Sequence, residues 1–242
     1  MASDLRALIP QPDEPLPTGE AKTRSVQAMF DVIAPRYDLV NRIMTFRMDV
    51  GWRRRAVAAL GLTPGSTVVD LACGTGDLAR DLEERHLVPI GADLSYGMLA
   101  NAPEPFPRIQ SDGSALPLRT AAVAGATCGF ALRNFTDLQG TFDELARVLR
   151  PGGRLSVVEV AEPPNPIMRA GHSIYFGRVV PLIGGLLSDG GAYRYLPRSV
   201  AYLPEWPELR AMIERAGFID VDRTLLSGGI AQMITATRIT EP

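Results

Sequence analysis

The sequence predicts an α/β fold in which a mostly parallel, seven-stranded sheet carries helices on both faces. Through the middle of the chain, short runs rich in β-branched residues alternate with segments of helical periodicity, the pattern of βαβ units. The chain then ends in two strand-like runs, 220–227 and 231–239, joined at Gly228-Gly229. This terminal hairpin predicts an antiparallel last strand. A chain of 242 residues suits one domain of this kind with a full core.

The expected elements follow one another along the chain. An aromatic-containing segment, 26–46, is broken at Pro35 and predicts short helices that wrap the domain. Strands are predicted over 67–73, 87–94, 124–132 and 154–160, with a further short strand ending before Asp112. Helices are predicted from near Trp52, over 77–84, after Ser95 as the N-cap, over 138–149 and over 209–216.

Domain boundaries follow from changes in composition. Residues 1–24 contain four prolines among acidic and small residues, a mixture that cannot bury enough apolar surface to order itself. We therefore expect a disordered tail over 1–24 and a single domain over 25–242. Within that domain, residues 162–203 interrupt the alternation with an apolar, glycine-containing stretch, which predicts an insertion that caps the substrate site.

Charge and cysteine content exclude several classes of protein. The net charge of −2 gives no reason to expect nucleic acid, whose binding proteins usually carry a basic face. Two cysteines, Cys73 and Cys128, suit a reducing compartment and offer neither a disulfide framework nor a metal site. No signal-peptide pattern and no run of 18 apolar residues occur, so we expect a cytoplasmic protein.

A glycine-rich loop directly follows the first predicted strand and opens a helix. Glycines in such a loop let the backbone turn tightly and approach a ligand closely, although a plain strand-to-helix turn needs them too. Asp93 ends the next strand, 23 positions after Asp70, where an acidic residue can hydrogen-bond a ribose diol. The loop and Asp93 together predict a site for an adenosine-containing cofactor. Its candidate loop contacts are Asp70, Ala72, Gly74 and Gly76.

The charges around this loop favour one cofactor over another. A dinucleotide would place a pyrophosphate at the helix N-terminus. Here the spacing is A-x-G-x-G, and Asp77 follows the last glycine, so that Asp70 and Asp77 would repel a pyrophosphate. Two carboxylates suit a ligand with an ammonium and a sulfonium. The sequence therefore predicts S-adenosylmethionine, with S-adenosylhomocysteine as the product, in a Rossmann-like fold of the class I methyltransferase type.

The adenine would lie beyond the second strand. Asp112-Gly113, after the third short strand, is the expected contact to the adenine amino group, and an ordinary polar turn is the alternative. Leu94 and Met98 are expected as apolar neighbours of the ring, although core packing explains them nearly as well.

The sequence lacks the motif that is typical of methyltransferases acting on the amino groups of nucleic acids. Amino-methyltransferases of nucleic acids carry a D/N-P-P-Y/F motif after the fourth strand, whereas this chain reads Phe130-Ala-Leu-Arg-Asn134 there. The similar run 162–165 follows the fifth strand and lacks the aromatic residue. We therefore expect a small organic acceptor.

Several narrower motifs resemble one family, the demethylmenaquinone and ubiquinone-biosynthesis C-methyltransferases, over about residues 25–230. The matching segments are "MFDVIAPRYDLVN", "VVDLACGTGDLA", "FALRNFTD", "LARVLRPGGRL", "YRYLPRSV" and "LSGGI". The resemblance implies methyl transfer to a ring carbon of a prenylated quinol. It also implies that Tyr37 and Asp38 close over the methionine end of the cofactor.

Two departures from the family pattern bear on the acceptor. Ala131 stands where the family has the glycine of "FG(L/I)RN". After "GGI" the family commonly has a short apolar stretch and a histidine, whereas this chain reads Ala231-Gln-Met-Ile234. They keep open a methyltransferase of the same subgroup that acts on another phenolic or polyketide molecule. A non-catalytic cofactor-binding scaffold is a third hypothesis, against which the intact loop and the retained Arg133-Asn134 argue.

Catalysis requires an activated acceptor. An aromatic carbon is a poor nucleophile until a neighbouring hydroxyl becomes a phenolate, so we expect Arg133 to stabilise that oxyanion and Asn134 to orient it. A structural ion pair is the alternative for Arg133. The base that takes the ring proton is left open among Tyr37, Asp38, Glu159, His172 and a water molecule. Glu159 and His172 also have structural alternatives.

The capping insertion suggests a lipophilic acceptor. Its stretch 174–187 is apolar yet includes Arg178 and glycines. It is expected either to be a plain cap or to form a hydrophobic mouth that admits an isoprenoid tail and touches the membrane surface. A homodimer is a further expectation.

Overall fold

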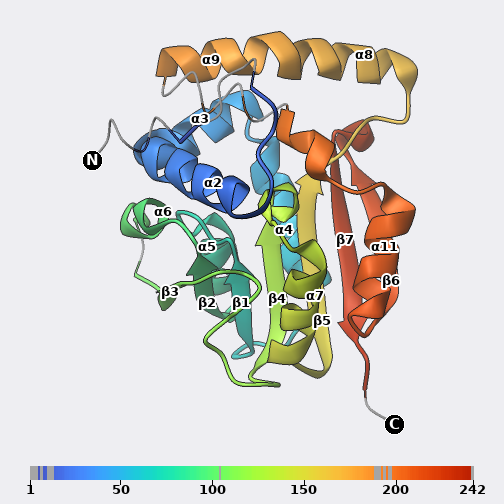
Figure 1. Ribbon diagram of the computed structural model, residues 1–242. Coiled ribbons are helices and arrows are strands. Elements are labelled where there is room, and N and C mark those ends of the chain that lie inside the picture. The colour runs from blue at the N-terminus through green and yellow to red at the C-terminus, as the bar shows by residue number, and fades with distance from the viewer. Residues whose placement is uncertain are drawn as a thin grey trace.

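Seven strands form one twisted sheet in the computed structural model, which describes residues 5, 8–9, 14–103, 105–187, 192, 195 and 198–240 (Figure 1). The strands are β1 (Thr67–Leu71), β2 (Val88–Asp93), β3 (Arg108–Gln110), β4 (Val123–Gly129), β5 (Leu149–Val160), β6 (Phe218–Leu226) and β7 (Ala231–Arg238). Their order across the sheet is β3-β2-β1-β4-β5-β7-β6. The strand order therefore reverses at β1: β2 and β3 follow on one side of it, and β4 and β5 on the other.

The last strand runs against the rest. Strands β1 to β5 pair in parallel, whereas β7 pairs antiparallel with both β5 and β6, with Val157 opposite Ile234 in the register. The predicted terminal hairpin is confirmed, and β7 inserts between β5 and β6. One expectation differs: Leu149 begins β5 rather than ending the preceding helix.

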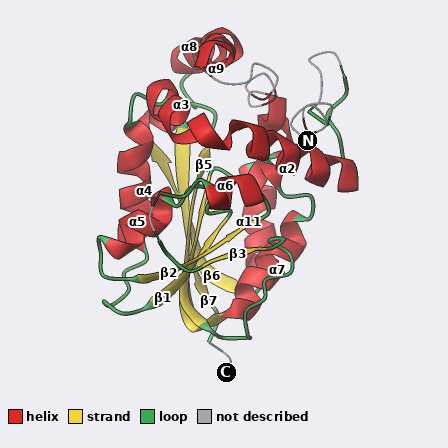
Figure 2. Cartoon of the chain, turned by 90° about the vertical axis from the view of Figure 1, so that its left-hand side faces the viewer, coloured by secondary structure: helices red, strands yellow, loops and turns green. Residues whose placement is uncertain are grey.

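Helices cover both faces of the sheet (Figure 2). On one face, α4 (Met48–Ala59) and α5 (Asp77–Glu83) bury Val57, Leu60, Leu78 and Leu82. On the other face, α7 (Leu138–Val148) and α11 (Trp206–Arg215) bury Phe142, Leu145, Leu209 and Ile213. The short helix α6 (Tyr96–Ala100) begins at Ser95, whose side chain accepts a hydrogen bond from the Met98 amide, as predicted. The two cysteines are free thiols buried in these layers.

Two N-terminal helices lie above the carboxyl ends of the strands (Figure 1). Helix α2 (Gly19–Ile33) leads through a 3₁₀ turn, Ala34–Arg36, into α3 (Tyr37–Met44). Helix α2 begins inside the segment 1–24, for which we expected no order, and Lys22 is already buried. Residues 19–24 therefore belong to the domain. Most of residues 1–13, including Pro10 and Pro12, lie outside the described residues.

A helical rod crosses the molecule above these helices. It consists of α8 (Pro166–Ile174), a π-helical turn (Tyr175–Val179) and α9 (Val180–Leu187). Figure 1 shows the rod spanning the top of the molecule, over α3. The Tyr175 hydroxyl donates a 2.7 Å hydrogen bond to the Met44 carbonyl and so ties the rod to α3. Residues 188–191, 193, 194, 196 and 197 of the expected insertion lie outside the described part of the chain.

Candidate active site

Two cavities adjoin at the carboxyl ends of β1, β2 and β4. The first encloses about 280 Å³ and the second about 370 Å³. They share a wall formed by Tyr37, Ala72, Gly74, Gly129 and Phe130. In an open α/β sheet, this edge at the point where the strand order reverses is where ligands bind. A ligand in one cavity can therefore meet a ligand in the other.

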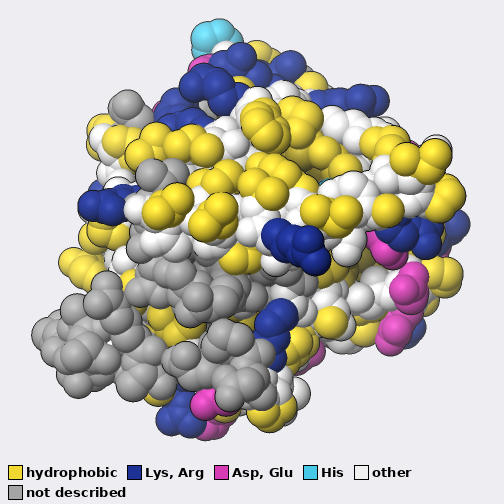
Figure 3. Space-filling view, turned by 90° about the horizontal axis from the view of Figure 1, so that it is seen from above, with side chains coloured by type: hydrophobic (Ala, Val, Ile, Leu, Met, Phe, Trp, Pro, Cys, Tyr) yellow, Lys and Arg dark blue, Asp and Glu magenta, His cyan; other side chains and the backbone are white. Residues whose placement is uncertain are grey.

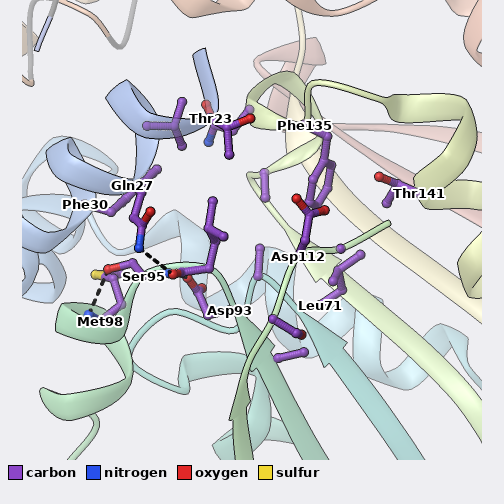
Figure 4. A pocket seen from close by; sticks show the side chains of 18 of the residues that line it. Thr23, Gln27, Phe30, Leu71, Asp93, Ser95, Met98, Asp112, Phe135 and Thr141 are labelled. Carbon is purple, nitrogen blue, oxygen red and sulfur yellow. Dashed lines mark hydrogen bonds between the residues drawn. The ribbon is translucent and has the colours of Figure 1, made fainter. Parts of the chain in front are cut away.

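The first cavity collects most of the predicted cofactor residues (Figure 4). Eight of them line it: Tyr37, Ala72, Gly74, Asp93, Leu94, Met98, Asp112 and Gly113. Of the other two, Asp70 lines the second cavity, and Gly76 lines neither but begins α5 with φ of 87°, a backbone conformation that favours glycine. Asp112 is anchored from its own turn, because its Oδ1 accepts bonds from the Ser114 amide and hydroxyl at 2.9 and 2.8 Å.

Asp93 connects the glycine loop to helix α6. Its Oδ2 accepts a 2.8 Å hydrogen bond from the Gly74 amide, and its Oδ1 accepts one of 2.8 Å from the Ser95 amide. Burial raises the pKa of Asp93 to about 6, although these hydrogen bonds act in the opposite direction. The carboxylate thus fixes the loop at the cavity wall and keeps unused lone pairs for a ligand.

Asp70 is a fully buried carboxyl with one satisfied oxygen. Thr127 donates a 2.8 Å hydrogen bond to its Oδ1, whereas Oδ2 has no partner among the described residues. Burial raises the pKa of Asp70 to about 7. A buried oxygen without a partner is costly, and a cationic ligand in the adjoining cavity would satisfy it.

Asp77 does not act as the free carboxylate that the sequence argument assumed. It forms ion pairs with Arg42 at 3.1 Å, Arg53 at 3.0 Å and Arg80 at 3.1 Å. The predicted repulsion of a pyrophosphate by two carboxylates is therefore wrong for Asp77, because three guanidinium groups compensate its charge. Asp70 alone supports that argument.

Helix α2 closes the first cavity from above, and the sequence alone does not predict this contact. Three of its side chains bond across the cleft. Lys22 Nζ donates to the Phe135 carbonyl at 2.8 Å, Gln27 Nε2 to the Leu94 carbonyl at 3.3 Å, and Thr23 shares a 2.8 Å hydrogen bond with Thr136. Figure 4 shows Thr23, Gln27 and Phe30 on this side of the cavity, opposite Asp93. The helical spacing of 26–46 was visible in the sequence, but its partners are 67 to 113 positions away.

The second cavity is largely apolar and lies under the rod. Its apolar lining includes Met44, Phe46, Met48, Trp52, Phe130, Met168, Tyr175, Phe176, Val180 and Ile230. Five of its charged or titratable lining residues are Asp49, Arg53, Asp70, Arg133 and His172. An aromatic molecule with a hydrocarbon substituent fits this combination of surfaces.

Arg133 and Glu159 form a buried ion pair beside this cavity. Arg133 Nη1 lies 2.5 Å from Glu159 Oε1 and also donates to the Phe130 carbonyl at 2.6 Å, while Nε donates to Ser199 Oγ at 3.2 Å. The other terminal nitrogen, Nη2, makes no hydrogen bond to a described residue, and Arg133 lines the second cavity. Glu159 is fully buried and lines neither cavity. Arg133 thus forms the structural ion pair that was the alternative to a catalytic role, but this pair leaves Nη2 available for a ligand.

Comparison with known proteins identifies the family. The sequence profile of the ubiE/COQ5 methyltransferase family matches residues 18–238. The chain belongs to this family. A demethylmenaquinone methyltransferase of Thermus thermophilus is 44% identical over 221 residues, 87% of this chain and 100% of that protein. A ubiquinone/menaquinone biosynthesis C-methyltransferase of Syntrophotalea carbinolica is 39% identical over 224 residues, 89% of this chain and 94% of that protein.

Solved structures of other methyltransferases share the fold. A possible histamine N-methyltransferase of Thermotoga maritima superposes with a TM-score of 0.62 at 18% identity, covering 88% of this chain and 99% of that one. Phosphoethanolamine N-methyltransferase 2 of Haemonchus contortus, in complex with S-adenosylmethionine, gives 0.58 at 14% identity, covering 78% and 53%. At these identities the likeness shows the fold alone. The Rossmann-like fold is confirmed by it, and family membership confirms the enzyme class, a methyltransferase dependent on S-adenosylmethionine.

The two departures from the family pattern lie away from the second cavity. Ala131 and Asn134 line the first cavity. Gln232 is buried in β7 and donates a 3.1 Å hydrogen bond to the Val160 carbonyl. Of the "GGIAQMI" stretch, only Ile230 lines the second cavity. Ala131 and Asn134 thus border the first cavity, while Phe130 and Ile230, the residues before the two departures, line the second.

The remaining candidates for the base are separated by the structure. Tyr37 lines both cavities, and burial raises the pKa of its hydroxyl. Asp38 lines neither cavity and accepts a 2.6 Å hydrogen bond from Thr75 Oγ1, which fastens α3 to the glycine loop. His172 lines the second cavity, and its Nε2 is buried without a hydrogen-bond partner among the described residues.

The family motif "LSGGI" lets the rod approach the sheet. Gly228 and Gly229 have φ of 74° and 98°. A Cβ on Gly228 would overlap with Met168 Cε, and one on Gly229 would lie 2.6 Å from Pro164 Cδ. Glycines are needed here for the left-handed backbone and for the close contact with the start of the rod. Met168, held in this way, lines the second cavity.

Proposed function

We propose that this methyltransferase binds S-adenosylmethionine in the first cavity and methylates a ring carbon of a prenylated quinol in the second. The observation that carries the proposal is the wall shared by a cavity that contains Asp93 and Asp112 and a second, more apolar cavity that contains Arg133. The cofactor supplies an electrophilic methyl group at its sulfonium and leaves as S-adenosylhomocysteine. The protein's own contribution is then chiefly to hold two reactants in line.

The residues present fit this cofactor. Asp93 retains lone pairs for a ribose diol, and Asp112 and Gly113 line the part of the cavity where an adenine would lie beside Leu94 and Met98. Asp70, two residues before Ala72 in the shared wall, is the proposed counterion for the ammonium group of the cofactor. The Tyr37 ring borders both cavities and can separate the sulfonium end from solvent.

Arg133 is the proposed stabiliser of the acceptor oxyanion. Its Nη2 is unused by the described residues, and Glu159, Phe130 and Ser199 hold the rest of the guanidinium in place. A fixed positive charge in an apolar, water-poor cavity lowers the pKa of a nearby phenol and stabilises its oxyanion. Glu159 is therefore a positioning residue. Asn134 lines the first cavity, so its proposed position is beside the cofactor.

We also propose that the upper face of the molecule touches a membrane. No helix of the described residues is long enough and apolar enough to cross one. Figure 3 shows apolar side chains spread over this face with Lys and Arg side chains among them. Phe46, Ile167, Leu182 and Leu186 are between 64% and 83% exposed there, and Phe46 also lines the second cavity. In this proposal a lipophilic acceptor passes from the bilayer into the cavity, and the enzyme works at the cytoplasmic surface of the membrane. A homodimer stays a prediction.

The deciding experiment is a single-turnover assay with labelled S-adenosylmethionine and chemically reduced demethylmenaquinone, with the oxidised quinone as the control. We expect methyl transfer to the reduced form alone, because only a quinol can become a phenolate. Transfer to another phenolic molecule instead would show that the acceptor is not a prenylated quinol. Cofactor binding without transfer to any acceptor would favour a scaffold.

Membrane contact has its own test with vesicles that contain anionic lipid. The double variant Leu182→Asp, Leu186→Asp, at two exposed residues that line neither cavity, should lose co-sedimentation with the vesicles yet still turn over a short-tailed quinol. Val88→Asp is the matched control, because Val88 is 45% exposed at the amino end of β2, the opposite end from the cavities. Equal sedimentation of all three proteins would refute the contact.

A further inference from the structure

His172 is a half-buried residue of the second cavity that the proposed mechanism has not yet used. It lies on α8, the first part of the rod, and is one of the residues that line the cavity. Its Nε2 is shielded from solvent and has no hydrogen-bond partner among the described residues. The Phe176 ring, with its centroid 4.4 Å from that of His172, packs against the imidazole one helical turn away. An unpartnered polar atom on a residue that lines a ligand cavity is a candidate for contact with the ligand.

C-methylation of a phenolate requires such a partner. When the ring carbon bonds to the methyl group, it carries both that group and its original hydrogen, and the ring has lost its aromaticity. The C–H bond must break, its electron pair returns to the ring, and a base must take the proton. A side chain positioned beside the ring carbon can act as this base.

Other titratable groups near the cavity are already engaged. Glu159 pairs with Arg133, and Asp38 accepts from Thr75; neither lines the second cavity. Tyr37 holds its proton more tightly because burial raises the pKa of its hydroxyl. The Tyr175 hydroxyl donates to the Met44 carbonyl.

The acidic residues that line the cavity are also engaged. Asp49 accepts from Thr45 and pairs with Arg53, and Asp77 pairs with three arginines. Asp70 lies at the end of β1, at the glycine loop, and is the proposed counterion of the cofactor's ammonium group.

We propose that His172 Nε2 accepts the proton that leaves the methylated ring carbon. The inference rests on the proposed function and deepens it. The C–H electron pair restores the aromatic ring, an N–H bond forms at Nε2, and the half-buried imidazolium passes the proton to solvent. The rod therefore is part of the catalytic machinery as well as a cover for the cavity.

The electrostatic surroundings agree with this role. Burial lowers the pKa of His172, and the nearby Glu162 acts in the opposite direction. The imidazole is therefore neutral at pH 7 and ready to take a proton.

The test compares wild type with His172→Gln, using an acceptor that carries deuterium at the ring position to be methylated. General-base catalysis is typically worth about 10²–10⁴-fold, so kcat should fall by that order while the Kd for S-adenosylmethionine stays within about twofold. Since deprotonation becomes slow, a primary isotope effect should appear or increase in the variant. Added imidazole should restore part of the rate.

The matched control is His86→Asn, which changes the other histidine. His86 has φ of 58°, a conformation that asparagine tolerates, and it lies on the turn after α5. It should behave as wild type. Normal turnover by His172→Gln, or a slower rate with neither an isotope effect nor rescue, would overturn the role of His172. Failure of wild type itself to methylate the quinol would overturn the proposed function before any variant is compared.

Discussion

Arg133 Nη1 lies 2.5 Å from Glu159 Oε1, and the two side chains are 5% and 0% exposed. The pair joins the 3₁₀ turn after β4 to the end of β5, and Glu159 Oε1 also accepts a 2.9 Å hydrogen bond from the Val160 amide. A buried pair of this kind contributes little net stability by itself, but the loss of one partner leaves an uncompensated charge. The pair therefore fixes the direction in which Arg133 presents Nη2.

Removal of Glu159 should destabilise the fold and reduce turnover together. Glu159→Ala leaves the Arg133 charge buried without its partner, which costs about 3–5 kcal/mol in the free energy of unfolding. Urea denaturation measures this loss, and the Kd for S-adenosylmethionine should change little. Glu162→Ala is the control, because its pair with Arg169 spans 3.5 Å between side chains that are 69% and 49% exposed. A loss as large in the control would show that burial is not the cause.

Asp93 should determine cofactor affinity. Asp93→Ala removes both the proposed ribose contact and the anchor of the Gly74 and Ser95 amides, so binding should weaken by about 1–3 kcal/mol. Isothermal titration calorimetry gives the Kd directly, with the exposed Asp143→Ala as the control. Because the pKa of Asp93 is raised to about 6, wild-type affinity should also decrease below pH 6. An unchanged Kd in the variant would remove Asp93 from the site.

Asp70 should make stability depend on pH. Its pKa is raised to about 7 in the folded protein, against about 3.9 in an unfolded chain. The folded state therefore binds a proton that the unfolded state releases, and the stabilisation present at low pH is lost as the pH rises from about 4 to about 7. Asp70→Asn removes this titration, so the variant should exceed wild type by about 2–4 kcal/mol at pH 8 and approach it near pH 5.

The same substitution should weaken cofactor binding, since the amide cannot neutralise an ammonium group. Unfolding curves at both pH values, together with the Kd at pH 8, test the two effects separately. Parallel pH profiles for the two proteins would contradict the assignment of this titration to Asp70.

The fold could be predicted from the sequence because its signals are local. Strand β1 is a β-branched run before glycines, Ser95 is a cap three residues before the amide that it binds, and Gly228-Gly229 separates two strand-like runs. The start of α2 could not be placed, because Lys22 is buried by contacts with residues near Phe135, far away in the sequence.

The site was predicted less completely, since side-chain roles depend on partners that spacing does not reveal. Asp77 was interpreted as a free carboxylate, but Arg42 and Arg53 come from helices 24 to 35 positions earlier. Glu159 and His172 were both candidates for the base. Only the folded chain shows that one is paired beneath Arg133 while the other lines the cavity.

Gly228 should control acceptor binding through Met168. An alanine there would place a Cβ at φ of 74° and in overlap with Met168 Cε, so the free energy of unfolding should fall by about 1–2 kcal/mol and Met168 must move. Because Met168 lines only the second cavity, the KM for the quinol should rise while the Kd for S-adenosylmethionine stays unchanged.

Gly177→Ala separates this effect from a general response of the rod to an added methyl group. A Cβ at Gly177 has no atom within 4 Å, and alanine favours helix, so this variant should match or exceed wild-type stability with normal KM. If Gly228→Ala instead weakened cofactor and acceptor binding equally, the glycine would serve the whole site rather than the contact with Met168. The double variant Gly228→Ala, Met168→Ala removes the overlap but keeps the backbone strain. It should therefore remain less stable than wild type, and its KM reports only the loss of the Met168 side chain from the cavity wall.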